Sequence, residues 1–258
     1  GRMTALNSGW TFDGVALNSA GAYAIRLLSP DEEVPARRGD NLLIPQRHGR
    51  VYRAKTFEQR TISLAMWVTG STPAALQTNL HTVQELFGRL GARTLSRTMP
   101  DATVRTISAE ASQMLLQPQS DKVYAAAVDL LCAAPWWQRT TVATTNQTGI
   151  GSSPTSVNLS NPGSAPHVGA TITIGGAITN PKVQIGSIWV QYTGAIGGGS
   201  SLVLDCENFT TTGGSVANIT HSGSTAWMVI PAGASSATLT GTGLSAASLR
   251  FDFYPRYF

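Results

Sequence analysis

The sequence predicts a mainly β protein built from two β-sandwich-like parts, and three patterns support this fold class. Short runs of alternating apolar and polar residues recur along the chain, as from Thr61 to Val68, and alternation of period two is typical of half-buried strands. Residues 72–90 form the one segment with convincing helical spacing. After residue 154, short strand-like runs are separated by Gly-rich turns, which favours a β-sandwich or jelly roll.

Composition divides the 258 residues near residue 140. Charged residues make up 12% of the chain and the net charge is +4, which is weak support for a dedicated nucleic-acid patch. Of the 18 Lys and Arg and the 14 Asp and Glu, only 3 and 3 follow residue 140. This shift, together with a Thr/Ser/Gly/Asn-rich stretch, predicts an N-terminal domain over 1–140, a linker over 141–154 and a C-terminal β-sandwich over 155–258.

Within the N-terminal domain, the sequence predicts several strands, one helix and one long loop. Strands are expected within 9–28 and over 61–68, 104–109 and 123–133, with 113–121 as a turn-rich link. Thr72 is the expected helix cap, Pro73 occupies the first helical position and Gly91 ends the helix. Six residues form its apolar stripe: Leu76, Leu80, Val83, Leu86, Phe87 and Leu90.

No catalytic or metal-binding motif is present in the sequence, so we expect no catalytic residue, no metal and no cofactor. None of the four His belongs to an HExxH or Cys/His pattern. Asp205 and Glu207 have a spacing that glycosidase carboxylates use, and a solvated strand edge is the alternative that we favour. Cys132 and Cys206 are expected to be reduced core residues. No run of 18 apolar residues occurs, so no membrane insertion is expected.

Aromatic residues of the second half suggest one binding surface. A β-sandwich often binds sugars on a concave face that carries aromatic rings, and Trp189, Tyr192 and Trp227 are the candidates for such a glycan face. Packing in the core or on a solvated face is the alternative reading of the same residues.

A series of motifs runs in order through residues 10–137. It comprises the early strands from Trp10 to Leu28, the loop with Arg38-Gly39-Asp40 and Gly49-Arg50, the Arg60 to Leu64 strand leading to Gly70, the helix, and Tyr124 and Val128 to Cys132 ending at Pro135-Trp136. This order resembles the distal tail protein family of siphophages. The second half, with Asn161 to Pro166 and the aromatic end from Phe253 to Tyr257, resembles the galectin-like sandwich of the same family.

The resemblance implies a structural hub at the phage tail tip, assembled in the host cytoplasm and carried in the virion. It implies a homo-hexameric ring that joins the tail tube and the tape-measure protein to tail-associated and receptor-binding proteins, with DNA passing through the lumen without specific binding. The alternative function is a carbohydrate-binding, lectin-like module that contacts glycans of the host surface.

The long loop between residues 29 and 56 is the expected contact between subunits of that ring. Its basic and Gly-containing part is made of Arg37, Arg38, Arg47, His48, Gly49, Arg50 and Arg53. Long arms and strand edges commonly join neighbouring subunits, so we expect this arm to cross to a neighbour. A loop folded back on its own sheet is the alternative.

Overall fold

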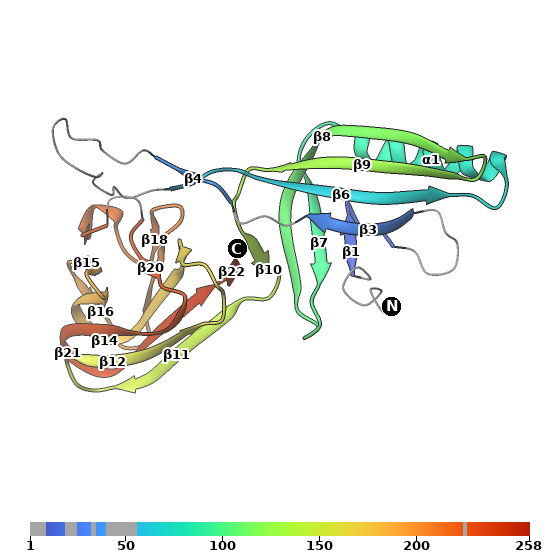
Figure 1. Cartoon of the computed structure of the whole chain (residues 1–258). Coiled ribbons are helices and arrows are strands. Elements are labelled where there is room, and N and C mark those ends of the chain that lie inside the picture. Colours follow the sequence, from blue (N-terminus) through green and yellow to red (C-terminus); the bar gives the residue numbers. More distant parts are fainter. Residues whose placement is uncertain (1–8, 19–24, 32–34, 40–55, 224–225) are drawn as a thin grey trace, which may run out of the picture. The chain divides into compact units, whose positions relative to one another are not determined.

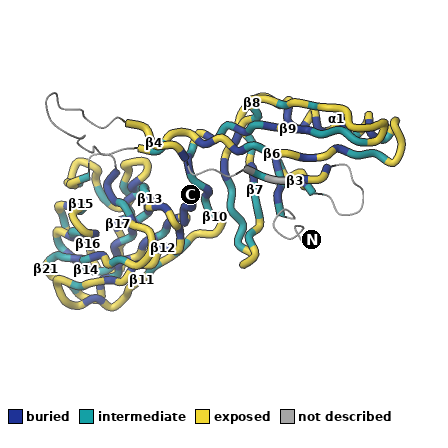
Figure 2. Tube along the Cα trace, in the orientation of Figure 1, coloured by how far each residue is buried: buried dark blue, intermediate teal, exposed yellow. Residues whose placement is uncertain are grey.

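The computed structural model describes residues 9–18, 25–31, 35–39, 56–223 and 226–258. The chain divides into two compact units (Figure 1): unit 1 comprises residues 1–140 together with Phe258, and unit 2 comprises residues 141–257. Both units are mainly β, and buried and exposed residues alternate along their strands (Figure 2). The predicted fold class, a mainly β chain with sandwich-like sheets and one α-helix among the described residues, is confirmed.

Unit 1 is organised around one antiparallel sheet with the strand order β2-β1-β7-β8-β9-β6-β3, in which β10 also pairs with β8. The strands are β1 (Trp10–Phe12), β2 (Val15–Ala16), β3 (Ile25–Asp31), β6 (Arg60–Thr69), β7 (Arg93–Thr98), β8 (Val104–Ser120), β9 (Val123–Cys132) and β10 (Trp137–Arg139). A separate pair consists of β4 (Arg37–Arg38) and β5 (Thr56–Phe57).

Helix α1 (Pro73–Gly88) lies against one face of this sheet, as Figure 1 shows. The hydroxyl of Thr72 accepts a hydrogen bond from the Ala75 N–H at 3.1 Å, which caps the helix as the sequence predicts. The helix residues that are buried are Leu76, Leu80, Val83, Leu86 and Phe87. The Phe87 ring stacks on Phe12 of β1 with their centroids 5.0 Å apart. Leu90 does not continue the apolar stripe, because it lies beyond the helix and is 89% exposed.

Close approach of helix and strand explains the glycine at position 70, between β6 and α1. A Cβ on Gly70 would meet the backbone nitrogen of Leu76 and lie 2.6 Å from its Cα. Backbone atoms within a helix cannot move aside cheaply, so we expect Gly70→Ala to destabilise unit 1 by about 1–3 kcal/mol. The matched control is Gly88→Ala, because a Cβ there has no atom within 4 Å. Urea unfolding checks both variants, and equal stabilities would contradict the close contact.

In unit 2, two long strands, β14 (Thr171–Ile185) and β21 (Gly233–Phe253), pair along most of their length. The main path of the sheet is β11-β21-β14-β15-β19, and β12, β16, β17 and β18 join it at the sides. The remaining strands are β11 (Ala143–Ile150), β12 (Thr155–Asn161), β13 (His167–Val168), β15 (Ile188–Tyr192), β16 (Ala195–Ile196), β17 (Ser201–Asp205), β18 (Thr210–Thr212), β19 (Ile219–His221), β20 (Val229–Ile230) and β22 (Arg256–Tyr257). Their inward side chains, among them Ile172, Leu204 and Phe251, form one hydrophobic core.

Two predicted loops are strands in the structure. Most of the expected linker 141–154 forms β11, which pairs with β21 from Ala143 to Ile150. β11 is an edge strand whose polar side chains are mostly exposed, so its amino-acid composition resembles that of a linker. The expected turn-rich link 113–121 is the second part of β8, paired with β9 beyond a bulge between Ala111 and Gln113. Pro118 lies there, as prolines do at sheet edges.

Candidate functional site

One face of the sheet in unit 1 carries few charged residues and several exposed apolar ones. The sheet strands β3, β6, β9 and β8 carry α1 on one side, and we call their other side the uncovered face. It carries Trp67 and Leu115, which are 40% and 49% exposed, with the exposed Ala65 and Ala127 beside them. Register places Trp67 opposite Ala125, and Ala65 opposite Ala127. Trp67, Leu115 and the two alanines form an exposed apolar patch among polar residues of this face, and exposed apolar patches often mark interaction sites.

One edge of the same sheet is also open among the described residues. β8 pairs with β7 and β10 over its first part, but beyond Ala111 its described pairing is with β9 alone. At the other edge, β3 pairs with β6 and makes only an isolated bridge, from Arg26 to Asn18. Unpaired strand edges present backbone donors and acceptors to a neighbouring chain.

The predicted arm has a defined base. Arg37 and Arg38 form β4, which pairs with β5 through Arg37–Phe57 and Arg38–Thr56, and the Glu58 N–H donates to the Ala36 carbonyl at 2.8 Å. Both arginine side chains are exposed. The rest of the predicted contact set lies outside the described residues: Arg47, His48, Gly49, Arg50 and Arg53. A role of the arm between subunits therefore stays a prediction.

Charge is separated between the two faces of the sheet. Directly opposed positions place Trp10, Arg97, Arg105 and Arg139 in one row across β1, β7, β8 and β10. Arg93 and Arg60 lie on the same face, opposite Ala109 and Cys132. That face is also the one covered by α1, since Phe12 is opposite Leu95 and stacks on the helix.

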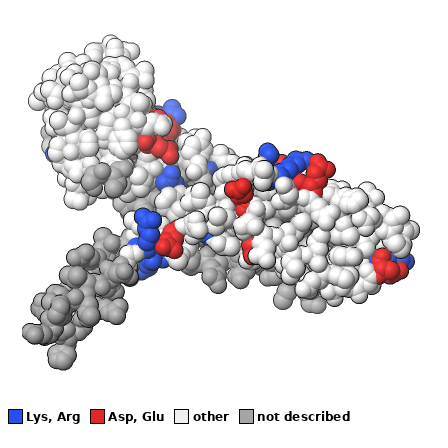
Figure 3. All heavy atoms as spheres, turned by 90° about the horizontal axis from the view of Figure 1, so that it is seen from above, with Lys and Arg blue, Asp and Glu red and all other residues white. Residues whose placement is uncertain are grey.

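The uncovered face, in contrast, carries few charges. Among the residues of β3, β6, β9 and β8 whose side chains are described, the charged ones on this face are Arg26, Glu110 and Asp129. Asp31 of β3 occupies a further acidic position on the face, opposite Ser63. Asp129 accepts a hydrogen bond from the Ser63 hydroxyl at 2.6 Å. Figure 3 shows one side of the molecule, on which the Lys, Arg, Asp and Glu residues form a few small groups among uncharged residues. The composition of the sequence predicted a low content of charged residues. That the arginines lie on one face of the sheet could be seen only from the strand register.

Arg97 is held by two tryptophans on the covered face. Its guanidinium carbon lies 4.6 Å from the centre of the Trp137 ring and 5.7 Å from that of Trp10. The two rings meet edge to face with centroids 5.5 Å apart. The sequence did not predict this cluster, although Arg93 and Arg97 alternate with Leu95 in one strand.

We expect Arg97→Met to destabilise unit 1 by about 1–2 kcal/mol, because methionine keeps an apolar stem but loses both cation–π contacts. Arg26→Met is the control, since Arg26 is an exposed arginine of the same sheet. Thermal unfolding of the two variants measures the difference, and equal melting temperatures would show that the tryptophan contacts contribute no stability.

The predicted glycan face is not formed by its three residues. Tyr192 and Trp227 are 8% and 3% exposed and belong to the core of unit 2. On β15 the inward positions are Val190 and Tyr192, so period-two alternation turns Trp189 to the other side. Trp189 is partly exposed and lies against Lys182, whose Nζ is 4.5 Å from the ring centre. Trp227 instead packs edge to face on Phe209.

Of the two carboxylates considered for catalysis, that of Asp205 stabilises a turn. Asp205 accepts hydrogen bonds from the N–H groups of Glu207 and Asn208, both at 3.0 Å, and from the Asn208 amide at 2.8 Å. Partial burial acts to raise the pKa of Asp205, but these hydrogen bonds outweigh it and the pKa is lowered. A general acid needs a raised pKa, so the lowered pKa of Asp205 does not suit that role. Glu207 faces Arg256 at 3.9 Å.

Other reactive groups are buried or dispersed. Burial raises the pKa of Cys132 to about 11 and that of Cys206 to about 12. Both are free thiols, as predicted. In the described ranges no three His, Cys, Asp or Glu residues gather as metal ligands. No helix among the residues described has the length and apolar character needed to cross a membrane.

The two-unit, mainly β fold matches known protein structures. The Dit protein of phage SPP1 superposes with a TM-score of 0.68 at 13% identity, over 95% of this chain and 98% of that chain. The phage p2 baseplate, in its Sr and Ca activated forms, aligns with TM-scores of 0.41 and 0.42 at 9% identity, over 89% of this chain. No model of a known protein family and no curated protein matches the sequence.

The chain therefore has the fold of a phage tail hub protein. More particularly, it has the fold of the SPP1 Dit protein, which is described as a paradigm of the hub adsorption apparatus in phages that infect Gram-positive bacteria. The resemblance to distal tail proteins predicted from the sequence is confirmed at the level of fold.

Proposed function

We propose that this protein is a non-enzymatic structural hub at the distal end of a siphophage tail. The observation that carries the proposal is the fold shared with the SPP1 Dit protein along nearly the whole of both chains. Function cannot be taken from fold alone, so the surfaces of this chain must also suit a hub. They do so through the uncovered face, the open edge of β8 and the arm that starts at β4 and β5.

In the proposed assembly, copies of the chain form a homo-hexameric ring. A ring requires two different surfaces that fit one another between successive copies. The open β8 edge and the arm provide candidates for one surface, and the opposite side of the sheet provides the other. The ring joins the tail tube and tape-measure protein to tail-associated and receptor-binding proteins, and it assembles in the host cytoplasm before entering the virion.

The separation of charge supports passage of DNA through the ring. Phosphate contacts with Lys and Arg hold DNA electrostatically. The uncovered face has one cationic position, Arg26, and three acidic ones, Asp31, Glu110 and Asp129. Five arginines of the same sheet lie on the covered face. If the uncovered face borders the lumen, DNA meets a wall with a single cation and moves without being bound.

Gold-labelled antibody against the chain, applied to purified virions, tests the location. The proposal predicts label at the distal end of the tail in electron micrographs. Label along the whole tail tube, on the capsid or on no particle would contradict it.

Glycan binding by unit 2 remains the alternative function. It now rests on Trp189 and Lys182, since Tyr192 and Trp227 are in the core. This alternative predicts retention on host glycans that Trp189→Ala abolishes.

A further inference from the structure

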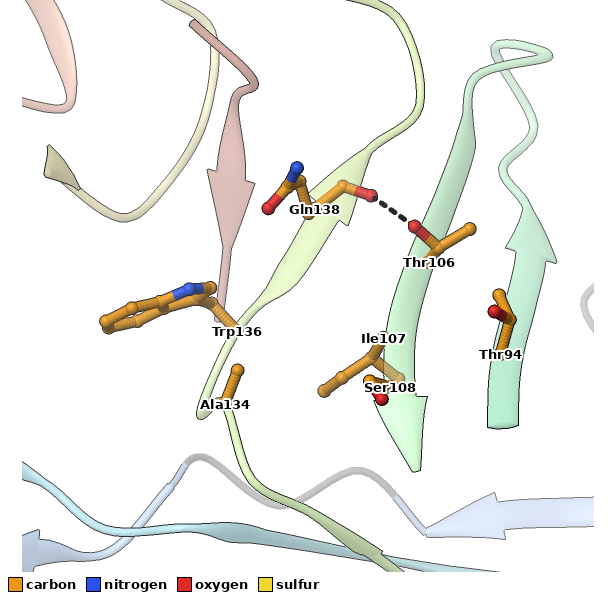
Figure 4. A pocket seen from close by; sticks show the side chains of 7 residues that line it. All are labelled: Thr94, Thr106, Ile107, Ser108, Ala134, Trp136 and Gln138. Atoms are coloured by element: carbon orange, nitrogen blue, oxygen red, sulfur yellow. Dashed lines mark hydrogen bonds between the residues drawn. The ribbon is translucent and has the colours of Figure 1, made fainter. Parts of the chain in front are cut away.

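A small pocket of unit 1 has the composition of a sugar site. It has a volume of about 270 Å³ and is lined by Thr94, Thr106, Ile107, Ser108, Ala134, Trp136 and Gln138. The residues come from β7, β8, the segment before β10 and β10 itself, as Figure 4 shows. The pocket lies on the opposite side of the sheet from the arginine row, because Thr94 pairs with Ser108 and Thr106 pairs with Gln138.

The chemistry of the lining restricts the ligand. Four of the lining residues carry a hydroxyl or an amide, and none is charged. The hydroxyl of Thr106 donates to the main-chain carbonyl of Gln138 at 3.4 Å. Among the described residues, the side chains of Thr94, Ser108 and Gln138 make no hydrogen bond to the protein. These groups are therefore available to a neutral ligand that both donates and accepts.

Trp136 adds an apolar surface to this polar set. Figure 4 shows its indole at one side of the pocket and Thr94 at the other. The face of an aromatic ring is electron-rich, so it suits the C–H groups on the flat side of a sugar ring, while the hydroxyls at the ring edge meet Thr, Ser and Gln. A fully apolar ligand would leave the polar groups without partners, which costs free energy.

The size of the pocket suits a single sugar ring. The volume of about 270 Å³ is below the range of roughly 300–1,000 Å³ of sites that bury drug-sized molecules. We propose that this pocket binds one residue of a neutral saccharide, stacked on Trp136 and hydrogen-bonded by Gln138, Thr94 and Ser108. The proposal does not depend on the hub function, and it places a sugar site in unit 1 and not at Trp189 of unit 2.

Saturation-transfer NMR on the full chain tests the proposal with the methyl glycosides of glucose, galactose and N-acetylglucosamine, and with glucuronic acid as a charged control. We expect signal transfer to at least one neutral glycoside, with a Kd of roughly millimolar for so small a contact. Trp136→Ala should weaken binding about fivefold or more, and Gln138→Ala should weaken it too.

Trp189→Ala is the matched control and should leave binding unchanged. Circular dichroism verifies that each variant is folded, and Trp136→Phe, which keeps a smaller aromatic face, should bind between wild type and Trp136→Ala if the alanine variant fails to fold. The proposal is overturned if no neutral glycoside receives signal, if glucuronic acid binds as well as the neutral sugars, if the Trp136 and Gln138 variants bind like wild type, or if Trp189→Ala alone removes binding.

Discussion

Removal of residues 40–55, with a short Gly/Ser turn joining Gly39 to Thr56, is expected to give a folded monomer. The physical reason lies at the base of the arm. β4 and β5 pair directly, so the two ends of the deleted segment are already neighbours and the closure leaves the sheet undisturbed. If the arm crosses to the next subunit, the deletion removes the contact between neighbouring subunits and the ring does not form. Size-exclusion chromatography with light scattering measures the loss.

The control for this deletion is Arg37→Ser with Arg38→Ser in the full-length chain. Both side chains are exposed, so the double variant separates the effect of their two charges from the effect of the segment. A deletion variant that keeps the oligomeric mass of the wild type would show that the arm is not the contact between subunits.

Acid is expected to destabilise unit 2 through His167. This side chain is 3% exposed, pairs with Ile230 between β13 and β20, and lies 5.6 Å from the Phe253 ring. Burial, and secondarily the charge of Arg256, lower the pKa of His167 to about 4. The unfolded imidazole takes up its proton near pH 6.5, so the unfolded state binds more protons between pH 6.5 and 4. Stability therefore falls through this window, by about 3 kcal/mol in total.

His167→Gln isolates this contribution, because glutamine is neutral at every pH. Carboxylates with lowered pKa values, such as Asp101 and Asp205, also destabilise the chain in acid, but they do so equally in both proteins. Urea unfolding at pH 7 and at pH 4 gives, for each of the two proteins, the change in the free energy of unfolding between these pH values. We expect wild type to lose more stability than the variant, and parallel pH profiles would show that His167 titrates normally.

Local sequence patterns correctly predicted the elements that have one buried side and one exposed side. β6 alternates because one side lies under α1 and the other is exposed, and α1 was predicted from Thr72, Pro73 and its apolar stripe. The patterns failed for strands whose side chains are exposed on both faces, because such strands lack the alternation of apolar and polar residues. β11 and the second half of β8 have mostly exposed side chains, so their polar composition resembles that of a loop.

Sites were harder to predict than elements because they depend on register. The arginine row and the pocket at Trp136 combine residues from β7, β8 and β10, which are far apart in the sequence. Conversely, Tyr192 and Trp227 were candidates for a surface because aromatic residues suit both cores and binding faces. Tyr192 is buried because it lies on the inward side of β15. Trp227 is buried in the core and packs against Phe209.

The mass of the purified chain in solution shows whether the proposed hexameric ring forms. Light scattering on a sizing column at two protein concentrations separates a closed ring from weak association. Six copies of the 27.1 kDa chain give about 163 kDa. We expect this mass, or twice it for two rings back to back, at both concentrations. A monomer mass at both concentrations would contradict a ring that forms through the surfaces of this chain alone.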